Sequence, residues 1–268
     1  MIDLSPYPNN IGKILNPKTD QFQLDKKIII RIFGLAGAGK GTLAKQLVNY
    51  YNIDNLETSN ILRSATWIYL QLGLEFNDEN SKYVFENIKV EFYHSKLHFT
   101  AITKHKIEFK LTDKELRSNE VQAKVAIFSG DPEFRKQYYD AIYYILNRLD
   151  NAVILDGRGS NTPYLDQAEA NGFKVIRIFL WANNKSNYER YKKAYKERNG
   201  VKFWDDYDEL KCKLEFQTNI PDRNIQDYNN AVSNDLGLLT EDTGIIDTSS
   251  LSPIQVLQVA VDFIQSQK

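Results

Sequence analysis

The chain has 268 residues, of which 42% are hydrophobic and 26% are charged, a composition typical of a globular protein with a sizeable core. Its formal net charge of −1 excludes an overall field that would attract nucleic acid or a membrane surface. Its single cysteine excludes an intramolecular disulfide, and the lack of a signal segment or of an apolar run near the roughly 20 residues that cross a bilayer predicts a cytoplasmic protein.

The N-terminal region is predicted to precede a single domain. Residues 1–25 contain several prolines among polar residues and have neither helical nor strand periodicity, so we predict an extension there and one domain over residues 26–268. A β-branched apolar run follows at residues 27–33, which is typical of a strand buried on both faces of a parallel sheet. Apolar residues at helical spacing then predict a helix from Thr42 to Tyr51.

A glycine-rich loop joins this strand to this helix. It comprises Gly34, Leu35, Ala36, Gly37, Ala38, Gly39, Lys40, Gly41 and Thr42. Glycines let the backbone bend around an anion, so that its N–H groups and the N-terminus of the following helix point at a phosphate, and the lysine reaches the terminal phosphates. Because Gly34, Gly39 and Lys40 have the spacing of a P-loop between a strand and a helix, we predict that the chain binds a nucleoside triphosphate and transfers a phosphoryl group.

The residue after the loop lysine departs from the general P-loop pattern. Gly41 stands where Ser or Thr normally contacts Mg²⁺, and Thr42 follows one residue later. We therefore expect phosphates and water to bind the Mg²⁺ of the nucleotide, with no direct protein ligand. Asp156 ends an apolar strand and is the candidate carboxylate that contacts this Mg²⁺ through a bound water. In the alternative interpretation Asp156 only caps the strand end.

The remaining elements predict a parallel α/β sheet flanked by helices. Strands are predicted at residues 152–156, 175–180 and 244–247, and helical stretches separate them. One helix carries the apolar stripe Phe134, Tyr138, Ile142, Ile145, Leu146 and Leu149, and another carries the stripe Ile254, Leu257, Val261 and Ile264. We expect Ser252 to cap the second helix, with Pro253 at its first position.

One region interrupts this alternation of strands and helices. Residues 89–112 contain two strand-like runs, at residues 99–103 and 107–111, without a helix between them. We predict a small antiparallel insert at this position.

Several segments resemble the nucleoside monophosphate kinases, whose P-loop has the form Gly-Lys-Gly-Thr found at residues 39–42. Residues 56–63 resemble the segment that these kinases place after their second strand, which ends in an arginine. Residues 111–121, with the insert before them, resemble a segment specific to bacterial cytidylate kinases. Three more segments resemble motifs of that family: Asp156-Gly157-Arg158, Arg223-Asn224-Ile225-Gln226-Asp227 and Ile246-Asp247-Thr248-Ser249.

The resemblance implies a P-loop NTPase fold with an acceptor-binding antiparallel insert and a helical lid at about residues 185–232. It implies transfer of the γ-phosphoryl group of ATP, with Mg²⁺, to CMP or dCMP. Catalytic roles are implied for Lys40, Arg158 and Arg223, and Arg190 is implied to join the P-loop in binding the ATP phosphates. Acceptor binding is implied for Thr58, Arg63, Arg117, Arg158 and Asp227: Arg63 and Arg158 for the phosphate, Arg117 for the pyrimidine and Asp227 for the ribose.

Departures from the family pattern lie on the acceptor side. The family's aspartate after Gly-Arg is Gly159 here, the arginine that ends its lid motif is Asn230, and its usual Ser-Gly is Thr58-Ser59. Loss of the aspartate removes a group that discriminates cytosine, and loss of the arginine removes a charge from the phosphate site. Two alternatives therefore stay open: a P-loop kinase for a different small acceptor, and a degenerate nucleotide-binding module with a regulatory role.

Retention of the cationic residues favours catalysis over the regulatory alternative. A module freed from chemistry has no catalytic need for Lys40, Arg63, Arg158 and Arg223, although each arginine taken alone is equally compatible with a solvated surface position. We expect a monomer whose partners are small nucleotide substrates, with no nucleic acid or membrane.

Overall fold

The computed structural model describes most of the chain. The described residues are 24–25, 27–35, 37–93, 96–102, 108–149, 151–157, 163–201, 204–219 and 242–267. All but residues 24 and 25 of the predicted N-terminal extension lie outside this part of the chain.

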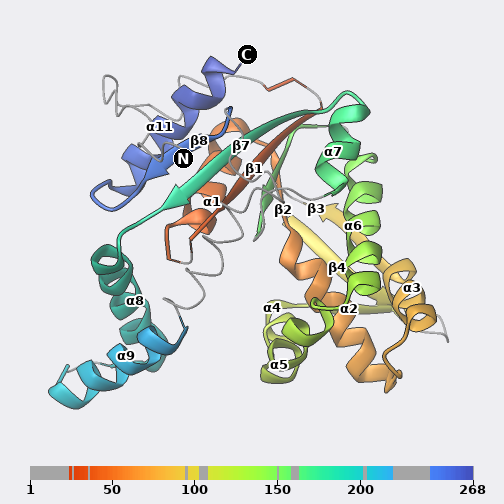
Figure 1. Ribbon diagram of the computed structural model, residues 1–268, viewed down its shortest axis with the longest axis horizontal. Coiled ribbons are helices and arrows are strands. Elements are labelled where there is room, and N and C mark those ends of the chain that lie inside the picture. Colours follow the sequence, from red (N-terminus) through yellow and green to blue (C-terminus); the bar gives the residue numbers. More distant parts are fainter. Residues whose placement is uncertain are drawn as a thin grey trace.

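A parallel sheet of five strands lies at the centre of the described structure, in the order β2-β6-β1-β7-β8 (Figure 1). The strands are β1 (Ile28–Gly34), β2 (Asp54–Glu57), β6 (Val153–Asp156), β7 (Lys174–Trp181) and β8 (Gly244–Asp247). The predictions of β1, β6, β7 and β8 are confirmed. Because β1 is the middle strand, it is buried on both faces, as its apolar run predicts.

The second strand was not predicted as a strand. The resemblance placed Leu56 and Glu57 after a strand, whereas both residues belong to β2, where they pair in register with Leu155 and Asp156 of β6. Only Leu56 of β2 is buried, because β2 is a short strand at the edge of the sheet. Such a strand has little apolar pattern to reveal it.

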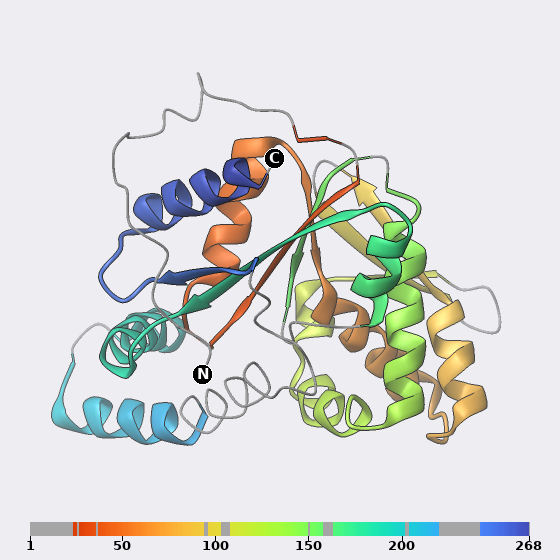
Figure 2. The ribbon, with the colours of Figure 1, turned by 45° about the horizontal axis from the view of Figure 1, so that its top comes forward.

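Helices cover both faces of the sheet (Figures 1 and 2). Those on one face are α1 (Lys40–Tyr51) and α11 (Pro253–Ser266), and those on the other are α2 (Thr58–Leu72), α6 (Pro132–Leu146) and α7 (Pro163–Ala170). Side chains alternate along β1, so that Ile30 and Ile32 enter the core beneath α1 and α11 and Ile29 enters the core beneath α2, α6 and α7. The predicted α/β layers are confirmed.

The two predicted apolar stripes lie on α6 and α11, with one exception. In α6, Phe134, Tyr138, Ile142 and Leu146 are buried, and Ile145 and Leu149 pack at the margin of the same core. In α11, Ser252 caps the helix and Pro253 opens it, as expected, and Gln255 completes a capping box with Ser252. The expectation for Ile254 is wrong: its side chain is 44% exposed, because the buried face of α11 begins only at Val256.

The predicted antiparallel insert is present as a separate sheet in the order β3-β4-β5. Its strands are β3 (Ile88–Tyr93), β4 (Lys96–Ile102) and β5 (Glu108–Leu111), and it is accompanied by α3 (Asp78–Glu86), α4 (Asp113–Leu116) and α5 (Asn119–Phe128). Leu111 and Leu116 join this part to the core beneath α2 and α6. The insert therefore packs on the α2 side of the central sheet (Figure 1).

Two further helices extend from the end of β7, where the helical lid is predicted. They are α8 (Asn184–Asn199) and α9 (Asp206–Asn219), and they lie side by side away from the central sheet (Figures 1 and 2). Cys212 is buried between them, with Tyr188 and Tyr191 of α8 against Phe216 of α9. No helix in the described part of the chain is long and apolar enough to span a membrane.

Candidate active site

The predicted site residues gather where the parallel strands end. Gly34 ends β1, Glu57 ends β2 and Asp156 ends β6, and Glu57 and Asp156 are register partners. In an open parallel sheet, ligands bind outside the carboxyl ends of the strands. The glycine loop and residues 56–63, the predicted acceptor segment, are therefore brought to one edge of the sheet.

The glycine loop has backbone conformations that other residues adopt only with strain. Gly34 has φ 129°, and a Cβ there would lie 2.7 Å from the backbone nitrogen of Leu180 on β7. Gly39 has φ 96° in the left-handed region and stands immediately before α1. These conformations turn the chain from β1 into α1, so that the helix N-terminus faces the loop. Ala36, also predicted to bind the nucleotide, lies outside the described residues.

The ammonium group of Lys40 lies across the loop. Its Nζ donates hydrogen bonds to the carbonyl oxygens of Gly34 and Leu35, both at 2.9 Å. These contacts hold a positive charge above the loop and next to the N-terminus of α1. A cation, a helix N-terminus and a glycine turn are thus combined in one anion-binding arrangement.

The carboxylate of Asp156 lies beside the first turn of α1. A Cβ at Gly41 would be 3.7 Å from its Oδ2. Burial raises the pKa of Asp156, the charges of Lys40 and Arg31 oppose that rise, and the charge of Glu57 adds to it. Mg²⁺ prefers hard oxygen ligands and commonly uses one carboxylate together with substrate phosphates and water. The position of Asp156 beside the phosphate loop fits such an ion.

Arg190 of α8, for which the resemblance implies binding of the ATP phosphates, contacts the glycine loop. Its guanidinium donates hydrogen bonds to the carbonyl of Gly37 at 3.2 Å and to Oγ1 of Thr248 at 2.9 Å, and it also contacts the Thr248 carbonyl. The hydroxyl of Thr248 in turn donates to the carbonyl of Ala38 at 3.0 Å. Thr248 therefore links the loop to α8, a role that the sequence did not reveal.

A carboxylate that the sequence did not single out joins two predicted acceptor residues. Glu57 pairs with Arg63 at 3.2 Å and with Arg117 at 3.1 Å, and it also accepts hydrogen bonds from Ser59 and Asn60. Nη1 of Arg63 donates further hydrogen bonds to Ser59 at 2.7 Å and to Asn60 at 2.8 Å. Glu57 thus brings together arginines that are far apart in the sequence. A carboxylate within residues 56–63, six positions before Arg63, is the signal that could have revealed it.

Thr58 occupies a different environment from the half-buried Arg63 and the exposed Arg117. Its side chain is 1% exposed, and its hydroxyl donates to the backbone carbonyl of Asp156 at 3.4 Å. Thr58 therefore connects the end of β2 with the end of β6. Its predicted contact with the acceptor stays a prediction.

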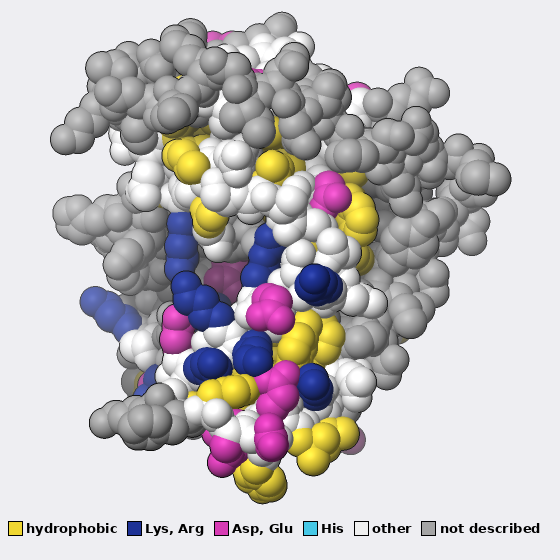
Figure 3. All heavy atoms as spheres, turned by 90° about the vertical axis from the view of Figure 1, so that its left-hand side faces the viewer, with side chains coloured by type: hydrophobic (Ala, Val, Ile, Leu, Met, Phe, Trp, Pro, Cys, Tyr) yellow, Lys and Arg dark blue, Asp and Glu magenta, His cyan; other side chains and the backbone are white. Residues whose placement is uncertain are grey.

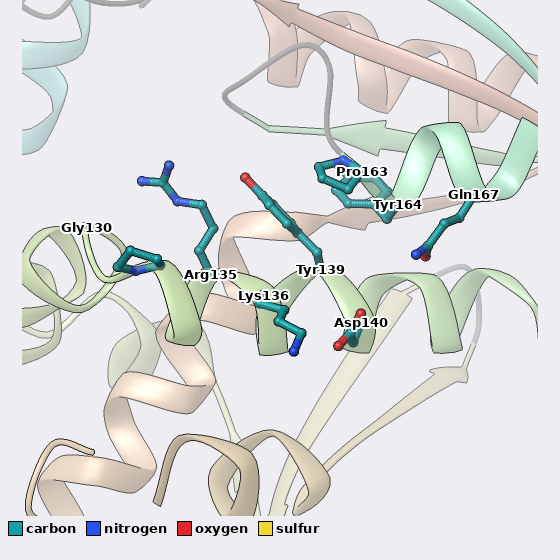
Figure 4. Close-up of a pocket in the computed structure, with 9 residues that line it drawn as sticks. Gly130, Arg135, Lys136, Tyr139, Asp140, Pro163, Tyr164 and Gln167 are labelled. Carbon is teal, nitrogen blue, oxygen red and sulfur yellow. The ribbon is translucent and has the colours of Figure 1, made fainter. Parts of the chain in front are cut away.

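A cavity of about 420 Å³ lies between α6 and the start of α7 (Figure 4). Its lining residues are Gly130, Pro132, Arg135, Lys136, Tyr139, Asp140, Pro163, Tyr164 and Gln167. The side chains of Arg135 and Tyr139 leave α6 on the same side (Figure 4), and the ring of Tyr139 lies 5.7 Å from the ring of Tyr164. Arg135 also donates to the carbonyl of Ser129. The sequence reasoning missed these two residues because it read α6 only for its buried stripe.

Other predicted site residues lie outside the described residues. These are Arg158, Arg223 and Asp227, together with the departures Gly159 and Asn230. On the face that carries α8 and α9, Lys and Arg side chains gather around a hollow with acidic side chains among them (Figure 3).

Comparison with known proteins places this arrangement in a family. The family model described as cytidylate kinase matches residues 30–266. The chain belongs to this family. The predicted resemblance is thereby confirmed, and with it a P-loop kinase fold.

Individual cytidylate kinases resemble the chain over most of its length. The cytidylate kinase of Acholeplasma laidlawii is 23% identical over 240 residues, which cover 89% of this chain and 96% of that protein. That of Listeria monocytogenes is 28% identical and covers 87% of this chain and 94% of the relative. That of Leuconostoc mesenteroides is 30% identical and covers 69% and 77%. The family match over residues 30–266 spans the glycine loop, the predicted acceptor segment at residues 56–63 and the predicted lid at about residues 185–232.

Proposed function

We propose that this protein transfers the γ-phosphoryl group of ATP to a nucleoside monophosphate, CMP or dCMP. One observation carries the proposal: the glycine loop with Lys40 and the arginine pair held by Glu57 meet at one edge of the sheet, through the neighbouring strand ends of β1, β6 and β2. A donor and an acceptor phosphate bound there would lie side by side. Membership of the cytidylate kinase family supports the same reaction.

On the donor side, the residues of the loop bind and orient the ATP phosphates. The backbone N–H groups and the N-terminus of α1 supply fixed dipoles. Lys40 supplies a positive charge: when ATP binds, its ammonium group donates to phosphate oxygens in place of the carbonyl oxygens of Gly34 and Leu35. Arg190 closes over the phosphates from α8. Mg²⁺, when bound, would neutralise charge on the phosphates, and Asp156 would hold it through water. We assign the same side of the reaction to Arg223 from the family resemblance.

On the acceptor side, Arg63 binds the phosphate of the nucleotide, and we assign Arg117 to its pyrimidine by resemblance. Charge-assisted hydrogen bonds from a guanidinium to a phosphate are among the strong ones, and Glu57 fixes both guanidinium groups before the substrate arrives. We assign Arg158 to the acceptor phosphate and Asp227 to its ribose by resemblance. No general base is required, because placement of two phosphates and exclusion of water supply most of the rate.

The resemblance gives the acceptor pyrimidine to Arg117, and the cavity between α6 and α7 offers a second place for the base. Arg135 offers hydrogen-bond donors there, and Tyr139 offers an aromatic face and a hydroxyl. Burial raises the pKa of Tyr139, so its hydroxyl stays protonated and can both donate and accept. Gly159 stands where the family has a carboxylate that discriminates cytosine. The preference of the protein for one acceptor base over another is therefore the property to measure.

A panel of acceptors tests the proposal. Purified protein is incubated with ATP, Mg²⁺ and, in turn, CMP, dCMP, UMP, AMP, GMP and dTMP, and ADP formation is followed. We expect the highest kcat/KM with CMP or dCMP. If the protein binds ATP but no acceptor stimulates ADP formation, the proposal is contradicted and a regulatory module is favoured. If only another monophosphate stimulates ADP formation, that monophosphate replaces CMP and dCMP as the proposed acceptor.

A further inference from the structure

A charged side chain lies in the middle of the central strand. Arg31 stands between Ile30 and Ile32 on β1, and its side chain is completely buried. A buried guanidinium is costly unless other groups compensate it, and apolar residues of similar volume are often equally stable or more stable at such positions. The strand would therefore be at least as easy to form with an apolar residue at this place.

The guanidinium of Arg31 lies at the end of β6, next to the acceptor side of the site. Its Nη1 donates to the carbonyl of Leu155 at 3.2 Å. A Cβ at Gly157 would lie 3.3 Å from Nη1 and 3.5 Å from Nη2, and it would collide with Oγ1 of Thr58. Arg31 and Thr58 together therefore form the surface on which Gly157 rests. Gly157 is the residue that directly precedes Arg158 in the chain.

Further polar groups surround this point. The carboxylate of Asp156 is close enough for the charge of Arg31 to lower its pKa, against the larger effect of burial. Tyr138 of α6 is buried close to Thr58 and Arg31, which both act to lower the pKa of its hydroxyl. Burial raises the pKa of Tyr138, so the hydroxyl remains neutral. The polar cluster of Arg31, Thr58 and Tyr138 thus connects α6 to the ends of β2 and β6.

The neighbouring strand offers a contrast. Arg177 of β7 is the register partner of Arg31 and is also buried. Its guanidinium forms a bidentate ion pair with Glu169 of α7, at 2.9 and 3.1 Å. That pair joins a helix to the sheet, and Arg177 contributes to the fold through it. Arg31 differs because its contacts lie at the strand end that carries Asp156 and Gly157.

We propose that Arg31 is a positioning residue for phosphoryl transfer, a buried cation that fixes Leu155, Gly157 and Thr58 at the acceptor side of the site. The inference rests on the proposed kinase reaction. Its guanidinium holds the end of β6 in one place and adds a fixed positive charge behind the acceptor phosphate. A shift of about 1 Å at a site of this kind can reduce the rate by about a hundredfold.

The test compares two neighbouring arginines, Arg31→Met and Arg177→Met, in the full chain. In folded Arg31→Met protein we expect kcat/KM for the acceptor to fall by about 10- to 100-fold. We also expect weaker binding of the acceptor by calorimetry without ATP, and a KM for ATP that changes by less than about twofold, since Lys40 is held by the loop carbonyls. Arg177→Met should lower the melting temperature and leave the acceptor parameters unchanged.

Two further variants keep the test decisive. Arg31→Lys keeps the charge with fewer donors, so it should recover part of the lost kcat/KM. Arg31→Gln keeps a hydrogen-bond donor for the Leu155 carbonyl. It takes the place of Arg31→Met in the test if the Arg31→Met protein does not fold. Wild-type acceptor kinetics in a folded, neutral Arg31 variant would overturn the inference.

The reference rate separates this inference from the proposed function. The wild type is first measured with the acceptor panel, and its best acceptor is used for all variants. No activity of the wild type with any acceptor would refute the proposed function. An active wild type with an equally active Arg31→Met protein would refute only the role of Arg31.

Discussion

Glu57 and Asp156 are register partners at the ends of two neighbouring parallel strands, and their carboxylates serve different cations. Glu57 pairs with Arg63 and Arg117, whereas Asp156 lies among the charges of Lys40 and Arg31. Because each carboxylate has its own cations, two negative charges can lie at adjacent strand ends. In the proposed reaction, the pair marks the line between the donor and acceptor sides.

Replacement of the loop lysine should abolish transfer without unfolding the protein. Lys40→Ala removes the charge that binds the transferring phosphoryl group, and we expect kcat to fall by about a thousandfold or more. Lys45→Ala, an exposed position on the same helix, is the matched control and should keep wild-type kinetics. Coupled ADP measurement and thermal melting check both variants. Unchanged turnover in Lys40→Ala would remove the loop from the mechanism.

Removal of the Glu57 charge should weaken acceptor binding alone. In Glu57→Gln the arginines lose their charge-assisted partner, and we expect the KM for the acceptor to rise by about tenfold. The KM for ATP should stay the same, because the loop contacts of Lys40 do not involve Glu57. Glu169→Gln breaks an arginine–carboxylate pair elsewhere and should leave both KM values unchanged. Equal changes in the two KM values would show that Glu57 supports the fold in general.

Asp156→Asn should separate stability from activity. The pKa of Asp156 is raised above its ordinary 3.8, mainly by burial, so the folded state favours the protonated form. Its contribution to stability is complete below about pH 3.8 and is lost as the pH rises through the raised pKa. At pH 7 the neutral asparagine should therefore leave the melting temperature equal or higher, while kcat falls by about tenfold or more.

Melting curves and kcat at pH 7 test this variant. Melting at pH 3 provides the control, because the wild-type carboxyl is then protonated and the stability difference should disappear. A lower melting temperature at pH 7 together with full activity would contradict both parts of the prediction.

Acidification should loosen the pair of helices α8 and α9. Hydrogen bonds from Lys192, Tyr188 and Trp204 lower the pKa of Glu209 to about 2. A lowered pKa means that the stabilisation is present above the ordinary value of 4.5 and is lost as the pH falls toward about 2. The fluorescence of Trp204, whose Nε1 donates to Glu209 at 2.7 Å, should change over this range.

Glu209→Gln should produce a similar change in fluorescence at neutral pH and raise the KM for ATP, because α8 carries Arg190. Glu197→Gln, at an exposed position of α8, is the control and should behave as the wild type. Wild-type fluorescence and ATP kinetics in Glu209→Gln would show that this carboxylate does not hold the two helices together.

The local features of this protein could be read from the sequence because their physical causes are local. A run of isoleucines predicted β1, and glycine spacing predicted the loop, since backbone conformation and burial depend on neighbouring residues. The capping box at Ser252 was predictable for the same reason. The edge strand β2 and the exposed Ile254 were not, because burial there depends on which elements lie above them.

The sequence by itself determined the phosphate loop, the α/β layers, the antiparallel insert and membership of a kinase family. Only the tertiary structure decided that Glu57 joins Arg63 to Arg117, that Thr248 ties the loop to α8, and that Arg31 lies beneath Gly157. These contacts connect residues from strands and helices that are distant along the chain. They exist because the strand order β2-β6-β1-β7-β8 brings those ends together, and no local pattern encodes that order.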